Sequence, residues 1–98
     1  MMTHSVFFKL YHEKGSDAET RFLNQAAELS EIPGVEHFQL VEETSPKNDF
    51  AFGLLMEFHN PAAYERYNKH PVHIAFVENS WLKEVAEFQE IDYVPFTE

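Results

Sequence analysis

Tyr67, His70 and His73 lie within seven residues of one another, on either side of Pro71. Proline stops a preceding helix but suits the first turn of the next one, so the segment predicts two helices that meet at a break. A phenol and two imidazoles can exchange protons, and apolar residues such as Phe76 follow directly. These residue types suit a small apolar pocket with acid/base chemistry, and they equally suit a packed core.

His73 is the first candidate for a base. A histidine with an ordinary pKa near ~6.5 is largely neutral at pH 7 in a partly buried pocket, so its imidazole is available to accept a proton. His70, directly before Pro71, is expected to have a structural role instead. Its imidazole is well placed to satisfy backbone groups that the helix break leaves unpaired.

Alternating strand-like and helical segments must position these side chains. The strand-like segments are 4–11, 35–42, 50–58 and 88–94, and the helical segments are 17–30 and 61–87. Ser16 with Glu19 has the form of a capping box before the first helix, and Asn60 with Pro61 can begin the second. The turn-forming residues between the second and third strands predict a hairpin.

The order β-α-β-β-α-β predicts an α+β, ferredoxin-like fold, in which two helices cover one face of a four-stranded antiparallel sheet. Both faces of the first strand carry large apolar residues, with Phe8 on one face and Phe7 on the other. The third strand is expected to repeat this pattern, with Phe50, Phe52, Leu54, Met56 and Phe58 on one face and Ala51, Gly53 and Leu55 on the other. Because the helices cover only one face, we expect a homodimer in which two sheets pack face to face.

Composition excludes several classes of function. The 98 residues, 44% of them hydrophobic, suffice for a single domain spanning 1–98. A net charge of −10 disfavours nucleic acid and anionic membranes as partners. The absence of cysteine excludes a disulfide framework and a Cys nucleophile. Without a signal-like or membrane-spanning segment, a soluble cytoplasmic protein is expected.

Four sequence features together resemble the stress-responsive A/B barrel (Dabb) family. They are the first strand from His4 to Leu10, the Ile32-Pro33-Gly34-Val35 turn, the Tyr67-x-x-His70-Pro71-x-His73 element and the closing Ile91-Asp92-Tyr93. The resemblance extends from about His4 to Val94 and implies a dimeric α+β barrel. Many members of this family have no assigned activity, whereas a plant member cyclises a polyketide by an intramolecular aldol condensation.

The resemblance to that plant cyclase implies roles for four residues. His73 corresponds to the general base, and Tyr67 to the hydrogen-bond donor that stabilises the developing enolate or alkoxide. His4 corresponds to a histidine that lines the pocket, and Asp92 to an acid that supports the base histidine. The first helix does not reproduce the lining of the cyclase cavity, in which an aromatic residue is expected near Gln25, so the substrate does not carry over.

The sequence also allows other interpretations. Each of the four residues can instead have a purely structural role or lie at the surface, and Trp81 suits core or dimer packing. His70 and His73 lack a third ligand for zinc, so neither a metal nor another cofactor is expected. Two functional hypotheses follow: a cofactor-independent cyclase or lyase acting on a carbonyl or phenolic small molecule, and a non-catalytic, stress-associated homodimeric binding or structural protein. Haem degradation ranks third.

Overall fold

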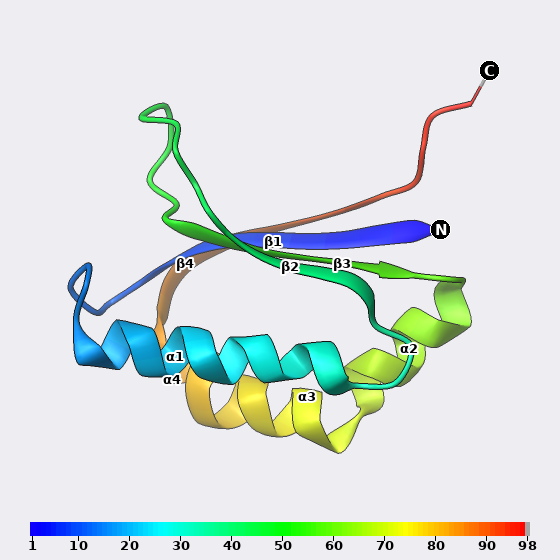
Figure 1. The fold of residues 1–98 in the computed structure, drawn as a ribbon, viewed down its shortest axis with the longest axis horizontal. Helices are drawn as coiled ribbons and strands as arrows, with labels where there is room; N and C mark the ends of the chain where they lie inside the picture. The colour runs from blue at the N-terminus through cyan, green and yellow to red at the C-terminus, as the bar shows by residue number, and fades with distance from the viewer. Residues whose placement is uncertain (98) are drawn as a thin grey trace.

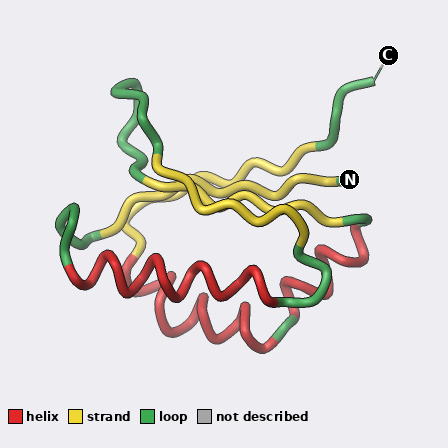
Figure 2. Tube along the Cα trace, in the orientation of Figure 1, coloured by secondary structure: helices red, strands yellow, loops and turns green. Residues whose placement is uncertain are grey.

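The computed structural model describes residues 1–97 and has the predicted order of elements. The strands are β1 (Met2–Leu10), β2 (Glu36–Glu42), β3 (Phe52–Phe58) and β4 (Val85–Tyr93). The first helical region is α1 (Asp17–Ala27) with a 3-10 turn, η1 (Glu28–Glu31), and the second is α2 (Pro61–Lys69), α3 (Pro71–Phe76), a π-helical turn η2 (Val77–Trp81) and α4 (Leu82–Glu84). The strands form one layer and the helices the other (Figures 1 and 2).

The four strands pair antiparallel in the order β2-β3-β1-β4. This order is that of a ferredoxin-like fold, so the predicted fold class is confirmed. The register between β1 and β4 sets His4 opposite Asp92 and Val6 opposite Glu90. Because side chains of paired residues point to the same face, all four of these side chains lie on the face that the helices cover.

Side-chain caps begin the helices where the sequence predicts them. Ser16 accepts a hydrogen bond from the backbone N–H of Glu19, and the Glu19 carboxylate accepts one from Gly15, one residue before the position that a standard capping box uses. Asn60 caps α2 by accepting a bond from the N–H of Ala63 at 2.9 Å. None of the helices within residues 1–97 is long and apolar enough to cross a membrane.

Several predicted boundaries are wrong, among them the start of the last strand, which is predicted at 88 and found at Val85. The second helical region ends at Glu84, three residues before the predicted end at 87, because β4 pairs with β1 from Val85 onward and the N–H of Tyr11 bonds to the Glu84 carbonyl. The third strand begins at Phe52, so Phe50 is not on the core face. The side chain of Asn48 accepts the Phe50 N–H in a turn, and Phe50 lines a hollow on the outer face of the sheet.

The core lies between the inner face of the sheet and the helices. Phe8 and Phe58 on the strands and Phe22 on α1 are fully buried. Phe8 and Phe22 also pack against Trp81, with ring centroids 5.1 and 6.2 Å away. These aromatic contacts fix the distance between the sheet and the second helical region, which determines how much space remains between them.

The outer face of the sheet carries apolar side chains, as the sequence predicts. Leu55 is partly buried there, and Ile91 and Tyr93 remain about half exposed. The ring of Phe7 lies across Gly53, where an added β-carbon would come within 2.5 Å of the Phe7 ring. Gly53 is therefore required for the close approach of this ring to the sheet.

We predict that Gly53→Ala lowers the free energy of unfolding by about 1–3 kcal/mol, because the new methyl group displaces the Phe7 ring. Chemical denaturation at a fixed protein concentration measures the loss. In a Phe7→Ala background the same substitution should cost clearly less. Equal costs in both backgrounds would show that the contact with Phe7 is not the cause.

Candidate functional site

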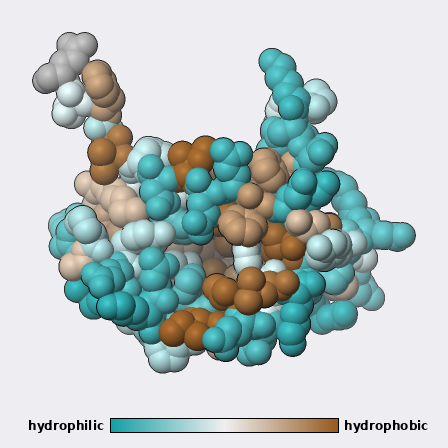
Figure 3. Space-filling view, turned by 180° about the vertical axis from the view of Figure 1, so that it is seen from behind, coloured by the Kyte–Doolittle hydropathy of each residue, from teal (hydrophilic) through white to brown (hydrophobic). Residues whose placement is uncertain are grey.

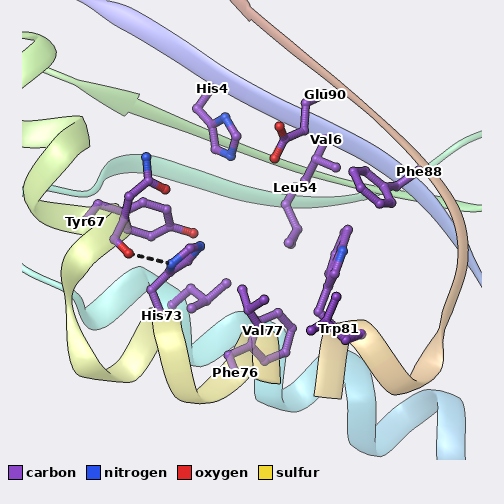
Figure 4. Close-up of a pocket in the computed structure, with 13 residues that line it drawn as sticks. His4, Val6, Leu54, Tyr67, His73, Phe76, Val77, Trp81, Phe88 and Glu90 are labelled. Carbon is purple, nitrogen blue, oxygen red and sulfur yellow. Dashed lines mark hydrogen bonds between the residues drawn. The ribbon is translucent and has the colours of Figure 1, made fainter. Parts of the chain in front are cut away.

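A cavity of about 320 Å³ lies between the inner face of the sheet and the second helical region (Figure 4). Its apolar lining comes from both layers and includes Leu54, Phe76, Val77, Trp81 and Phe88. The polar residues His4, Tyr67, Asn68, His73 and Glu90 complete the lining. The reverse side of the molecule is hollowed near its centre, and hydrophobic side chains surround parts of the hollow (Figure 3).

The helix break at Pro71 places Tyr67 next to His73. Tyr67 lies in the last turns of α2, and His73 in the first turn of α3. Between them His70 has an extended backbone (φ −67°, ψ 136°), and its Nδ1 accepts the N–H of Val72 at 3.1 Å. His70 thus caps α3, as expected, and the change of direction brings the Tyr67 and His73 rings to a centroid distance of 4.5 Å.

The environment of His73 leaves one ring nitrogen free to accept a proton. Its Nδ1 lies 3.2 Å from the carbonyl oxygen of Asn68, which the break has released from helical bonding. A carbonyl can only accept, so Nδ1 carries the hydrogen and Nε2 keeps its lone pair. Burial lowers the pKa of His73, outweighing the Asn68 bond that raises it, so the ring is neutral at pH 7.

Tyr67 is suited to donate a hydrogen bond and not to ionise. Its side chain is almost completely buried, and burial raises the pKa of the phenol well above its usual value of 10, with a smaller contribution from Tyr64. Phe58 and Tyr64 pack against its ring. In the part of the chain that the structure describes, no side-chain hydrogen bond occupies the Tyr67 hydroxyl, which leaves it available to a ligand.

His4 is held by Asp92 on the neighbouring strand. The His4 Nδ1 lies 2.5 Å from a carboxylate oxygen of Asp92, and the Tyr64 hydroxyl is 3.4 Å from the same nitrogen. The bond to a carboxylate fixes the orientation and tautomer of the imidazole. His4 itself is buried and lines the cavity, whereas Asp92 lies behind it. Within residues 1–97, Asp92 therefore supports His4, and it makes no hydrogen bond to His73.

Sequence reasoning did not identify several residues of the lining, of which three matter most for the chemistry of the site. The sequence predicts core or dimer packing for Trp81, and this residue also forms one wall of the cavity. Asn68 enters through the helix break. Glu90 could have been predicted from the alternation of side chains along a strand. It lies two residues before Asp92 and therefore points to the same face of the sheet. The first helix contributes no lining, whereas Leu29 of η1 does.

The site contains general bases and hydrogen-bond donors. Among residues 1–97 no group of three or more His, Asp or Glu side chains is arranged to hold a metal ion. An imidazole with a free lone pair next to a protonated phenol can remove a proton from a carbon acid and stabilise the oxyanion that forms. An apolar cavity strengthens both interactions because it excludes competing water.

Comparison with known proteins assigns the chain to a family. Residues 2–95 match the model of the Stress Responsive A/B Barrel Domain. The chain therefore belongs to the Dabb family. A search of curated proteins gives no significant match.

Solved structures share the fold. A Dabb family protein from Mesorhizobium loti with a ferredoxin-like fold is 50% identical, with a TM-score of 0.96, and the match covers 98% of this chain and 97% of that one. A dimeric protein of unknown function from Bacteroides fragilis is 21% identical, with a TM-score of 0.71 and coverage of 94% and 93%. A hydroxynitrile lyase from Passiflora edulis is 14% identical, with a TM-score of 0.83 and coverage of 97% and 93%.

We predict that His73 makes stability depend on pH below about 6.5, the usual pKa of an unfolded histidine. Because the folded pKa is lower, the unfolded chain binds more protons between the two values, and the free energy of unfolding falls as the pH drops through this window. The contribution is fully present above the unfolded pKa. Urea unfolding between about pH 7.5 and about pH 5 should show this decline in the wild type and a smaller decline in His73→Gln.

The matched control for this prediction is His59→Gln, since the His59 side chain is 80% exposed. It should leave the pH dependence of the wild type in place. An NMR titration that places the pKa of His73 above 6.5 would contradict the burial argument.

Proposed function

We propose that this protein is a small-molecule enzyme of the dimeric α+β barrel type, which enolises or condenses a carbonyl compound in lyase- or cyclase-type chemistry without a cofactor. One observation carries the proposal: His4, Tyr67 and His73, which are far apart or on separate helices, converge on one largely apolar cavity. Pockets of this kind, with a few convergent polar groups, are typical of small-molecule sites.

The roles follow from the protonation states of the side chains. In the proposed reaction, the Nε2 of His73 takes a proton from the carbon next to the substrate carbonyl. The electron pair of that C–H bond forms the new C=C bond, and the carbonyl oxygen becomes an enolate oxygen. Tyr67, kept protonated by its burial, donates a hydrogen bond to this oxygen. The enolate carbon then attacks a second carbonyl or takes back a proton from His73.

His4 and Asp92 have a positioning role in this proposal. Asp92 holds the Nδ1 of His4, so the Nε2 of His4 faces the cavity as a hydrogen-bond acceptor. A substrate hydroxyl donated to this nitrogen would fix the reacting carbon relative to His73. The two histidines thus act on different parts of one ligand.

Relatives and family members support catalysis on this fold. The Passiflora edulis structure is that of a hydroxynitrile lyase. The sequence resemblance to a plant polyketide cyclase implies the same roles for His4, Tyr67, His73 and Asp92. The alternative is a non-catalytic homodimer with a binding or structural role. In that case these side chains would contribute only to the stability of the fold.

The homodimer is the second part of the proposal. The outer face of the sheet exposes Ile91 and Tyr93, and the chain end beyond β4 adds Phe96, which is 89% exposed. Figure 1 shows that the loop between β2 and β3 and the C-terminal end both project from this side of the sheet. A second copy packed face to face would cover these apolar side chains, and the Bacteroides fragilis structure is described as dimeric.

We predict that the protein accelerates exchange of the methyl hydrogens of 3-hydroxyacetophenone for deuterium in D2O, followed by proton NMR. Exchange requires only proton removal and enolate stabilisation. His73→Ala should slow the enzymatic exchange by about 10²–10⁴-fold, and Tyr67→Phe should slow it by a similar factor.

His59→Ala provides the control, since this exposed histidine lies outside the cavity lining. It should exchange at the wild-type rate. The non-catalytic alternative predicts instead that His73→Ala lowers the free energy of unfolding by about 1–3 kcal/mol while the wild type shows no exchange above the buffer rate.

The dimer makes a separate prediction about Ile91. Ile91→Asp introduces a charge into the outer face and should convert a dimer into a monomer in sedimentation velocity. Val72→Asp is the matched control, because Val72 is similarly exposed but lies in the helical layer. A wild-type protein that sediments as a monomer at micromolar concentration would refute the dimer.

A further inference from the structure

Glu90 is the one acidic side chain among the residues that line the cavity. It lies on β4 opposite Val6, between the positions of Phe88 and Asp92 on the same face. Its carboxylate points towards His4 and the interior of the cavity (Figure 4). Glu90 is exposed to solvent in the single chain, so its carboxylate lies at the open side of the cavity, where an entering ligand meets it.

No partner neutralises this carboxylate inside the cavity. Neither lysine nor arginine occurs in the lining, and within residues 1–97 the Glu90 side chain forms no hydrogen bond or ion pair. The charge acts on its neighbours all the same. Burial raises the pKa of Tyr67 and Glu90 adds a smaller increase, whereas burial lowers the pKa of His73 and Glu90 offsets a small part of that decrease. The polar end of the cavity therefore has a negative potential.

We propose that Glu90 is a specificity-determining residue, which selects uncharged carbonyl compounds bearing a hydroxyl group and disfavours ligands that carry a carboxylate. This inference rests on the proposed function, because it names the class of substrate for the same cavity.

The argument combines repulsion with hydrogen bonding. A ligand carboxylate at the polar end of the cavity, beside His4, lies close to Glu90, and the two like charges repel each other. A hydroxyl group instead donates to the Glu90 carboxylate or to His4. The aromatic body of the ligand packs against the wall that Trp81 and Phe88 form together, where their rings meet edge to face at 5.5 Å.

Two ligands of nearly equal shape test the proposal. 3-Hydroxyacetophenone carries an uncharged acetyl group where 3-hydroxybenzoate carries a carboxylate. Binding is measured by isothermal titration calorimetry, and the fluorescence of Trp81, the single tryptophan of the chain, reports that the ligand enters this cavity. The variants are Glu90→Gln, which keeps the size and removes the charge, and Glu31→Gln, which removes one exposed charge outside the cavity lining.

The wild type should bind the ketone about tenfold more tightly than the carboxylate, or better. Glu90→Gln should reduce this ratio to within about threefold, mainly by tightening binding of the carboxylate, whereas Glu31→Gln should keep the wild-type ratio. Equal binding of both ligands by the wild type, or an unchanged ratio in Glu90→Gln, overturns the proposal. Failure of both ligands to change Trp81 fluorescence or to release heat overturns it as well.

These outcomes are separable from a failure of the proposed function. If the selectivity follows Glu90 but no deuterium exchange occurs, the cavity selects ligands without catalysis, and only the enzymatic part is wrong. If exchange occurs but the ratio does not depend on Glu90, catalysis stands and the role of Glu90 is wrong.

Discussion

The missing N–H of Pro71 is the constraint on which the site depends. Because proline cannot donate to the preceding turn, α2 ends at Lys69 and the last carbonyls of that helix lose their helical partners. One of them, the carbonyl of Asn68, accepts the Nδ1 hydrogen of His73. A single backbone defect thus turns the chain, sets the tautomer of the candidate base and brings it against Tyr67.

The register of the sheet supplies the other half of the site. Pairing of β1 with β4 sets the imidazole of His4 against the carboxylate of Asp92, and alternation sends both to the inner face together with Glu90. The same inner face is otherwise filled by large apolar side chains such as Phe8. Polar groups therefore gather at one end of the sheet, where the helices leave a cavity.

Much of this arrangement could be predicted from local signals. Capping residues and Pro61 locate the helix starts, and alternation in β1 and β3 predicts an apolar outer face. The end of the second helical region could not be located in this way, because pairing of Val85 with Leu10 overrides the helical propensity of the sequence. Long-range pairing decides such a boundary, and one sequence does not display it.

The sequence also did not show which histidine contacts the carboxylate of Asp92. Resemblance to a cyclase implies an acid that supports the base histidine, which suggests Asp92 against His73, yet the register places Asp92 against His4. Trp81 shows the opposite difficulty. A helical tryptophan is equally suited to packing in a core and to lining a cavity, so the sequence does not distinguish the two roles. In the structure, Phe8 and Phe22 pack against one part of the Trp81 ring, and another part of the ring lines the cavity.

The nitrogen atoms of His73 give the most direct test of this account. Long-range proton–nitrogen correlation NMR at pH 7 distinguishes the two ring nitrogens. We expect a neutral ring with hydrogen on Nδ1, and a shift of the Nε2 resonance when 3-hydroxyacetophenone is added. A hydrogen on Nε2, or a free Nε2 that no added ketone perturbs, would contradict the role of His73 as the base of this cavity.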